Sequence, residues 1–347
     1  MNDNNPLWNR IYSLAKEIYR LAPWNWMFES DIFGVQIPGT DRVYFISIMG
    51  SGGDFPAISA YRGSRALGQF WQLADLQDMA RPEDLLLIPH IMLSFTGRNE
   101  LSAEQHSSIK LSGLKFRGAA SWPSLEEIVP GYMPVLPEGD SVSDAEIILE
   151  QTIEVVRRTA NNPDILYSES DEDDYLVREK SKGQAGTDWS ERFREYDTDK
   201  PEIKYLAEFS REKALKVSLL PEKRFIIQLD LVMLPAPIKE KGKKGYFPFA
   251  LLMADKSNGF VSGMDMLVPE PDLKTMYESV PGEVLTQLEN LGKRPQKIEV
   301  GSPLMKHLLS PALKTAGVRL LQVEYLQMID EVTESLISSL GSGPMDS

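Results

Sequence analysis

The sequence predicts an α+β protein made of two domains. Three observations lead to this fold class: a length of 347 residues, hydrophobic and charged fractions of 42% and 25%, and a mixture of helix-type and strand-type patterns in each half. A domain usually takes about 100–200 residues, so the chain has room for two, each with its own core. We expect an N-terminal α+β domain over residues 1–163 and a C-terminal α+β domain over residues 203–347.

Residues 164–202 are predicted to form an acidic linker between these domains. The chain carries 37 basic and 51 acidic residues, a net charge of −14. Because the segment 164–202 holds 13 acidic and 6 basic residues, half of the excess negative charge lies in it. Such a segment is typical of a hydrated connector. Three aromatic residues indicate that its second part packs against a neighbouring surface: Trp189, Phe193 and Tyr196.

Helix-type and strand-type patterns follow one another in the first half. Apolar residues at positions 7, 11, 14, 18 and 21 recur every three or four residues, which predicts an amphipathic helix that Pro23 ends. Three strand-type runs and one helix-type run follow at residues 32–37, 43–49, 55–61 and 64–76. A capping box at Ser143 and Glu146 predicts a longer helix that reaches about Arg158.

The second half has the clearer pattern, in the order β-β-β-α-β-α-β-α. The five strand-type runs are residues 224–234, 246–254, 260–268, 297–300 and 318–325. Asn258-Gly259 predicts a hairpin between the second and third runs, so the first three strands should form an antiparallel meander. A helix over 271–291, split at Pro281, and another after Ser302-Pro303 precede the last two strands. These helical crossovers predict that both strands run parallel to residues 224–234, before a final helix over 328–340.

This element order, over residues 224–340, resembles the ribonuclease H-like fold of integrases, transposases and many nucleases. Ile227-Gln228-Leu229-Asp230 resembles the first strand of integrases, which carries a metal-binding aspartate, and residues 255–263 resemble their second hairpin. The chain departs from the family where the fourth strand should end in a second aspartate, because Gly301-Ser302-Pro303 stands there. The resemblance implies a five-stranded mixed sheet with a degenerate site.

The whole chain also resembles an uncharacterised bacterial family of conserved hypothetical proteins, formed by domains of unknown function. Four short segments carry this likeness: Pro23-Trp24-Asn25-Trp26-Met27, Asp31-Ile32-Phe33-Gly34-Val35, Met49-Gly50-Ser51-Gly52-Gly53 and Tyr61-Arg62-Gly63. The family brings no established activity, so the resemblance concerns organisation and not mechanism.

Several kinds of chemistry are excluded by composition. The chain has no cysteine, which excludes disulfides, thiolate nucleophiles, iron–sulfur clusters and cysteine-based zinc sites. Its three histidines, His90, His106 and His307, have no metal-ligand spacing. No cofactor is therefore predicted. Five tryptophans of the first half fit either the core of an α+β domain or an interface or stacking surface: Trp8, Trp24, Trp26, Trp71 and Trp122.

Asp230 is the most informative single residue. The strand that carries it is apolar on both faces, and a carboxylate is costly there unless it is paired, hydrogen-bonded or bound to an ion. One interpretation is a structural carboxylate that pairs across the sheet or caps a helix. The alternative is a metal ligand that acts with Asp330 or Glu334 from the last helix, as two-metal hydrolysis requires several converging carboxylates.

The predicted function follows from these alternatives. We expect a non-catalytic cytoplasmic binding or regulatory protein with a protein partner; the alternative is a metal-dependent hydrolase or nuclease that uses Asp230 with Asp330 or Glu334. Acidic side chains clustered around Asp230 would favour the enzyme, and an exposed apolar patch would favour the binding protein. The oligomeric state stays open.

Membrane and nucleic-acid partners are not expected. The longest apolar run, residues 85–95, is shorter than the ~20 residues of a spanning helix, and the first residues lack a secretory signal pattern. Nucleic-acid binding needs a concentrated basic surface. The second half is neutral overall, and its one dense basic cluster reads as a solvated loop: Lys239, Lys241, Lys243 and Lys244.

Overall fold

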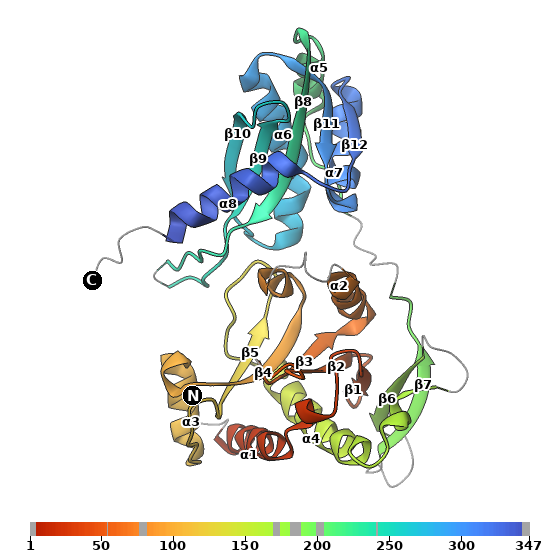
Figure 1. Cartoon of the computed structure of the whole chain (residues 1–347), viewed down its shortest axis with the longest axis vertical. Coiled ribbons are helices and arrows are strands. Elements are labelled where there is room, and N and C mark those ends of the chain that lie inside the picture. Colours follow the sequence, from red (N-terminus) through yellow and green to blue (C-terminus); the bar gives the residue numbers. More distant parts are fainter. Residues whose placement is uncertain are drawn as a thin grey trace. The chain divides into compact units, whose positions relative to one another are not determined.

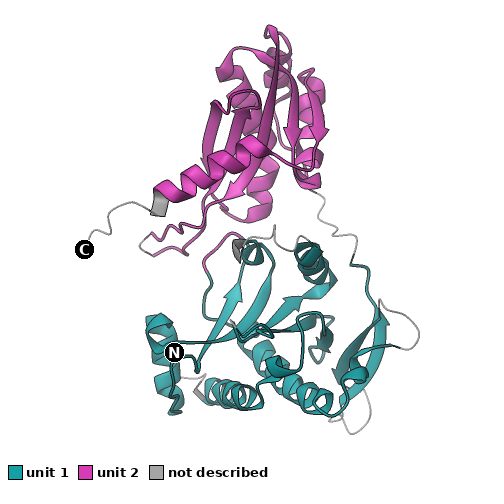
Figure 2. Ribbon diagram, viewed as in Figure 1, with its two compact units in different colours: residues 1–130, 134–202 teal, residues 131–133, 203–347 magenta. Residues whose placement is uncertain are grey.

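The chain divides into two compact units, each with its own β-sheet (Figure 2). The computed structural model describes residues 5–53, 55–75, 82–168, 174–180, 189–198, 205–240 and 242–341. Unit 1 contains residues 1–130 and 134–202, and unit 2 contains residues 131–133 and 203–347. Both sheets are mixed and both carry helices on their faces, so the predicted α+β class is confirmed.

Unit 1 is built on a sheet of seven strands. The strands are β1 (Phe33–Gln36), β2 (Val43–Met49), β3 (Ala57–Arg62), β4 (His90–Thr96), β5 (Trp122–Ile128), β6 (Asp174–Lys180) and β7 (Trp189–Glu195). Their spatial order is β5-β4-β3-β2-β1-β6-β7 (Figure 1). Neighbours are antiparallel except β1 and β6, which are parallel.

Helices cover both faces of this sheet. The α-helices are α1 (Asn5–Leu21), α2 (Gly63–Asp75), α3 (Ala103–Ser112) and α4 (Asp140–Thr159), and the 3₁₀ helices are η1 (Pro23–Asn25), η3 (Pro82–Leu87), η4 (Arg98–Glu100) and η5 (Pro163–Leu166). Side chains alternate along β2, so Ile46 packs in the core under α1 and α4, while Phe45 packs on the opposite face with α2. This double burial explains why β2 is apolar at successive positions.

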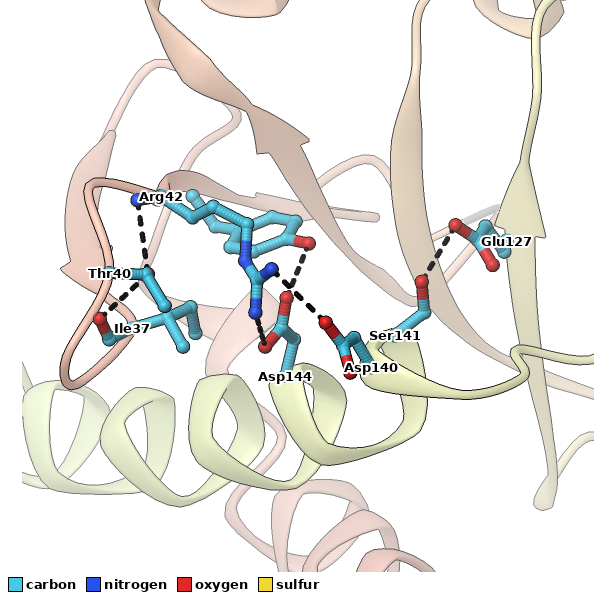
Figure 3. A network of polar contacts seen from close by, with 8 residues as sticks. Ile37, Thr40, Arg42, Glu127, Asp140, Ser141 and Asp144 are labelled. Carbon is cyan, nitrogen blue, oxygen red and sulfur yellow. Dashed lines mark hydrogen bonds and ion pairs between the residues drawn. The ribbon is translucent and has the colours of Figure 1, made fainter.

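A network of polar contacts fixes α4 against β2 (Figure 3). Asp144 of α4 is only 3% exposed; it accepts a hydrogen bond from the Tyr44 hydroxyl at 2.9 Å and one from the Arg42 guanidinium at 3.1 Å. Arg42 also reaches Asp140, in the first turn of α4, at 3.3 Å. A buried carboxylate is tolerated when it is paired in this way. The helix begins at Asp140 after Gly139, so the predicted start at Ser143 was too late.

The interpretation of residues 164–202 as a linker is wrong for most of the described part of this segment. β6 pairs with β1, and β7 pairs with β6, so both strands extend the sheet of unit 1. Charges on this hairpin pair with each other: Glu191 accepts from Arg178, and Glu179 accepts from Arg194. Trp189 packs against the core, as predicted for this part. Most of the acidic run, residues 169–173, lies outside the described residues.

Unit 2 is built on a sheet of five strands. The strands are β8 (Glu222–Met233), β9 (Phe249–Asp255), β10 (Val261–Leu267), β11 (Arg294–Val300) and β12 (Arg319–Gln322), and the helices are α5 (Arg211–Ser218), α6 (Leu273–Leu291), α7 (Pro303–Thr315) and α8 (Gln327–Gly341). The spatial order is β10-β9-β8-β11-β12. β8, β9 and β10 form an antiparallel meander, and β11 and β12 run parallel to β8. The predicted strand directions are therefore confirmed.

The helices of unit 2 divide between the two faces of the sheet. Helices α5, α6 and α7 cover one face with a large apolar core, and α8 crosses the other (Figure 1). Ser302 caps α7 as predicted, its hydroxyl accepting from the backbone N–H of Met305 at 3.1 Å. The predicted split of α6 at Pro281 is wrong. Pro281 is buried inside a continuous helix, where packing outweighs the lost backbone hydrogen bond.

Three residues from an earlier part of the chain complete unit 2. The backbone N–H of Met133 donates to the carbonyl of Gly245, and that of Phe247 donates to the carbonyl of Gly131, both at 2.9 Å. The Tyr132 hydroxyl donates to the backbone carbonyl of Pro269. Gly131 has a φ of +83°, and a Cβ atom there would lie 2.9 Å from Pro269, so this position requires glycine.

Candidate functional site

Asp230 lies in the middle of the unit 2 sheet. It is half-buried on β8, on the face that α8 covers, and its Oδ1 accepts from the backbone N–H of Leu231 at 2.9 Å. A Cβ atom at Gly301 would lie 3.7 Å from its Oδ2, so the end of β11 adjoins it. The predicted departure at Gly301-Ser302-Pro303 therefore falls directly beside the aspartate.

Glu299 of β11 is the most deeply buried carboxylate near this position. It is 1% exposed and pairs in register with Gln228, two residues before Asp230 on β8. The Lys256 ammonium donates to its Oε2 at 2.8 Å, and the Lys297 ammonium contacts its Oε1 at 2.7 Å. Two cations thus offset the charge of one buried anion.

The ionisation of Glu299 reflects two opposing effects. Burial by itself would raise the pKa of this carboxyl, because it disfavours the charged form. Hydrogen bonds from Lys256, Lys297 and Gln228 favour the charged form, and together they hold the pKa below its ordinary value. Glu299 is therefore a carboxylate at neutral pH.

Gln228 connects this carboxylate to α8. Its amide nitrogen donates to Glu299 Oε2 at 3.4 Å, and its amide oxygen accepts from the backbone N–H of Met328 at 2.9 Å. Met328 lies in the first turn of α8, where backbone N–H groups have no partner within the helix. A single side chain thus joins the start of α8 to the buried ion pairs.

Asp330 and Glu334 lie on α8 but are exposed, whereas Ile329 and Thr333 of the same helix are buried. The two positions share a face of the helix, and that face points to solvent. Among the described residues, no group of three histidine, aspartate or glutamate side chains is placed to hold a metal ion.

Comparison with known families assigns both halves of the chain. Residues 8–178 match the model of a domain of unknown function (DUF7309), and residues 213–337 match the model of a second domain of unknown function (DUF6930). The first match lies in unit 1 and the second in unit 2, and we call the matched regions the DUF7309 domain and the DUF6930 domain. A comparison with curated proteins found no match. Asp230, Glu299 and most of α8 lie within the DUF6930 domain, whose match ends at residue 337.

The DUF6930 domain also presents an apolar surface along β10. β10 is the end strand of the sheet and, in the described part of the chain, pairs with β9 alone. Asp265 contacts Gln287 of α6, so the alternate side chains at 264, 266 and 268 point to the opposite face. We define the β10 patch as the exposed apolar residues of this strand and its flanks: Phe260, Val261, Met264, Met266 and Val268.

Among the described residues, the contacts of the three histidines are with residues other than Asp230. His90 lies on β4 of the DUF7309 domain, is 4% exposed, and makes a 2.8 Å contact between its Nδ1 and the carbonyl of Ile88. Burial lowers the pKa of His90 to about 4, although that contact opposes the shift. His106 is half-buried on α3, and Nε2 of His307 lies 3.3 Å from the carbonyl of Tyr205.

Sequence reasoning missed Glu299 and Lys256. A signal for Glu299 was present, because it lies between Ile298 and Val300 in a strand that helical crossovers place in the sheet interior. Such an acidic residue needs a buried partner. No comparable signal in the sequence indicated Lys256. This residue belongs to the turn between β9 and β10, and the tertiary structure brings it to Glu299.

No helix in the described part of the chain has the length and apolar character needed to cross a membrane.

Proposed function

We propose that the chain is a non-catalytic cytoplasmic binding protein, whose DUF6930 domain is a degenerate ribonuclease H-like module that binds an extended segment of a protein partner at β10. The single observation that carries this proposal is the β10 patch on an open sheet edge. Met264 and Met266 are 50% and 47% exposed, at alternate positions of the same strand face.

The edge of β10 has the chemistry of a strand-addition site. An end strand offers a row of backbone N–H and C=O groups, and proteins usually protect such an edge with lysine or proline. Here the outward face of the strand carries Met264 and Met266, and Val268 follows them. An added strand would gain backbone hydrogen bonds from the edge and specificity from apolar side chains at alternate positions. Methionine suits such a surface because it adapts its shape.

Strand order supports the ribonuclease H-like part of the proposal. An antiparallel meander followed by two parallel strands, with helices before each, is the arrangement that the resemblance implies. The ion pairs near Asp230 support the proposal that the metal site of this fold is degenerate here. Lys256 and Lys297 already neutralise Glu299, and a carboxylate engaged by two cations is a poor ligand for further cations.

A metal-dependent hydrolase or nuclease is the second candidate. Asp230 and Glu299 lie on adjacent strands and on the same face of the sheet, which favours it. In that case Asp330 or Glu334 would have to turn inward from the exposed side of α8.

Selection from a library of random ten-residue peptides on the immobilised full chain tests the binding proposal. We expect enriched peptides to carry apolar side chains at alternate positions. The double variant Met264→Glu, Met266→Glu should weaken their binding at least tenfold, because two charges replace the apolar contacts. Hydrogen exchange should show slower exchange of β10 amides when such a peptide is bound.

The matched control is Leu215→Glu with Leu219→Glu, which alters two exposed leucines on and after α5 in the same unit. It should leave peptide binding unchanged. Selected peptides that bind the methionine variant as tightly as the wild type, or that protect a different strand, would show that β10 is not the binding edge.

Replacing Asp230 by asparagine separates the two candidate functions. We expect the full chain to cleave neither DNA nor RNA nor hybrids with magnesium or manganese, and Asp230→Asn to change only stability. The substitution removes a charged acceptor of the Leu231 N–H, which costs about 1–2 kcal/mol in unfolding free energy. Metal-dependent cleavage by the wild type that is absent from a folded Asp230→Asn variant would establish the hydrolase instead.

A further inference from the structure

Unit 1 contains a pocket beside α3 that belongs to none of the features described so far. Its volume is about 550 Å³, within the range of small-molecule sites. The wall is formed by Arg98 of η4, by α3, by the chain that follows α3 and by the first residue of β5. It combines four cationic residues, Arg98, Lys110, Lys115 and Arg117, with the rings of His106, Phe116 and Trp122.

The charge of this pocket differs from that of the chain. Among the described residues, four cationic side chains line it and no carboxylate does, although the net charge of the protein is −14. Across the described residues, none of these four side chains forms an ion pair, whereas Arg157 and Arg158 of the same unit each pair with a glutamate. A concave surface lined by charge of one sign attracts and concentrates ligands of the opposite sign.

The ring of Trp122 lies among these cations, with two further rings tilted against it. The guanidinium of Arg98 is 5.6 Å from the ring centre of Trp122, and the rings of His106 and Phe116 lie 6.2 Å and 6.1 Å from it. Phe116 is buried against Tyr12, so this side of the pocket is anchored in the core of the unit. Trp122 itself stays half-exposed, which leaves part of its ring open to a ligand.

We propose that this pocket binds a nucleoside polyphosphate. The cationic side chains suit the phosphate groups, since lysine and arginine are the usual partners of phosphate oxygens. Trp122 and His106 suit the base, because every base has a π-face that stacks on an aromatic ring. A long nucleic acid is a poorer fit, since the excess negative charge of the chain would repel the phosphates that extend beyond this pocket.

Calorimetric titration of the full chain at low salt with ATP, tripolyphosphate and adenosine, all without metal, tests each part of the proposal. We expect ATP to bind at least fivefold more tightly than tripolyphosphate, because the latter lacks the ring. Adenosine should bind at least tenfold more weakly than ATP, because it lacks the charge. Added salt should weaken the binding of ATP, since screening reduces attraction between exposed charges.

Two variants locate the binding in the pocket. Lys110→Glu with Arg117→Glu reverses two exposed charges and should weaken ATP binding at least tenfold. Trp122→Phe retains an aromatic ring for the core; it should lower the preference for ATP over tripolyphosphate and remove the change in tryptophan fluorescence on binding. The matched control is Lys16→Glu, an exposed reversal on α1 of the same unit, which should leave binding within twofold.

Three results would overturn the proposal. Equal affinity for ATP and tripolyphosphate would show that the base of ATP contributes nothing to binding. An equal loss in the Lys16→Glu control would indicate general attraction of anions. Binding of a single-stranded oligonucleotide more tightly than ATP, with the same dependence on Lys110 and Arg117, would assign the surface to nucleic acid.

Discussion

Replacing both Lys256 and Lys297 by methionine is expected to lower the unfolding free energy of unit 2 by about 3–5 kcal/mol at neutral pH. The two ammonium groups are the cationic partners of Glu299, which is 1% exposed. Without them, the contact that Glu299 keeps among the described residues is the 3.4 Å hydrogen bond from Gln228. The structure must then hold an uncompensated charge or raise the pKa of Glu299 until it binds a proton.

The single variant Glu299→Gln should lower the unfolding free energy of unit 2 by less than the double lysine variant does. Lys256 is partly exposed and can turn to water when its partner is lost, so no buried charge remains there. The control Lys216→Met with Lys306→Met changes two exposed lysines of the same unit and should leave stability unaltered. Denaturant titration followed by hydrogen exchange of β9 and β11 measures these effects. A lysine variant as stable as the wild type would mean that Glu299 is not held by ion pairs.

Unit 1 should lose stability when the pH falls from about 6.5 to 4, because His90 is buried in its neutral form. Its pKa is about 4 in the folded chain, below the ordinary value of 6.5. Between these values the unfolded chain binds the proton and the folded chain does not, so the unfolded state is favoured as the pH decreases. The stabilisation is complete above about pH 6.5, and its loss across this window amounts to about 3 kcal/mol.

Tryptophan fluorescence measures this effect selectively, since all six tryptophans lie between Trp8 and Trp189 in unit 1. His90→Asn keeps an N–H group near the position of Nδ1 and removes the titration. Its unfolding free energy should therefore depend less on pH than that of the wild type. His106→Asn, at a half-buried position, is the control and should keep the full pH dependence. An unchanged pH dependence in His90→Asn would contradict the assignment.

Local patterns were sufficient to predict the sheet of unit 2. β8, β9 and β10 are runs of apolar residues, and Asn258-Gly259 marks the hairpin between the last two. Gly259 indeed has a φ of +68°, and Asn258 Oδ1 accepts from the N–H of Phe260. Turn chemistry of this kind acts within a few residues, so it can be read without knowledge of the fold.

Features that depend on distant partners could not be predicted in the same way. A count of the charged residues in β6 and β7 suggests a hydrated segment. Arg178 and Glu191 neutralise each other in the folded hairpin, and a count along the sequence does not reveal this pairing. Pro281 remains inside α6 because it is buried there, and this packing outweighs the lost backbone hydrogen bond. Among the candidate site residues, Asp230 was identified from its apolar strand. The partners of Glu299 come from three places: Lys256 from a turn, Gln228 from the neighbouring strand β8, and Lys297 from β11 itself.

The contribution of residues 131–133 to unit 2 has a consequence for biosynthesis. Gly131 and Met133 leave the ribosome well before Gly245, Phe247 and Pro269, which supply their partners. At about 5–20 residues per second the delay is on the order of 10 s. Once β7 has followed, unit 1 has all the strands of its sheet, but residues 131–133 stay unpaired until Gly245 and Phe247 are made. A C-terminal fragment that begins at residue 203 would lack these contacts permanently, so separate expression should include residues 131–133 or the whole chain.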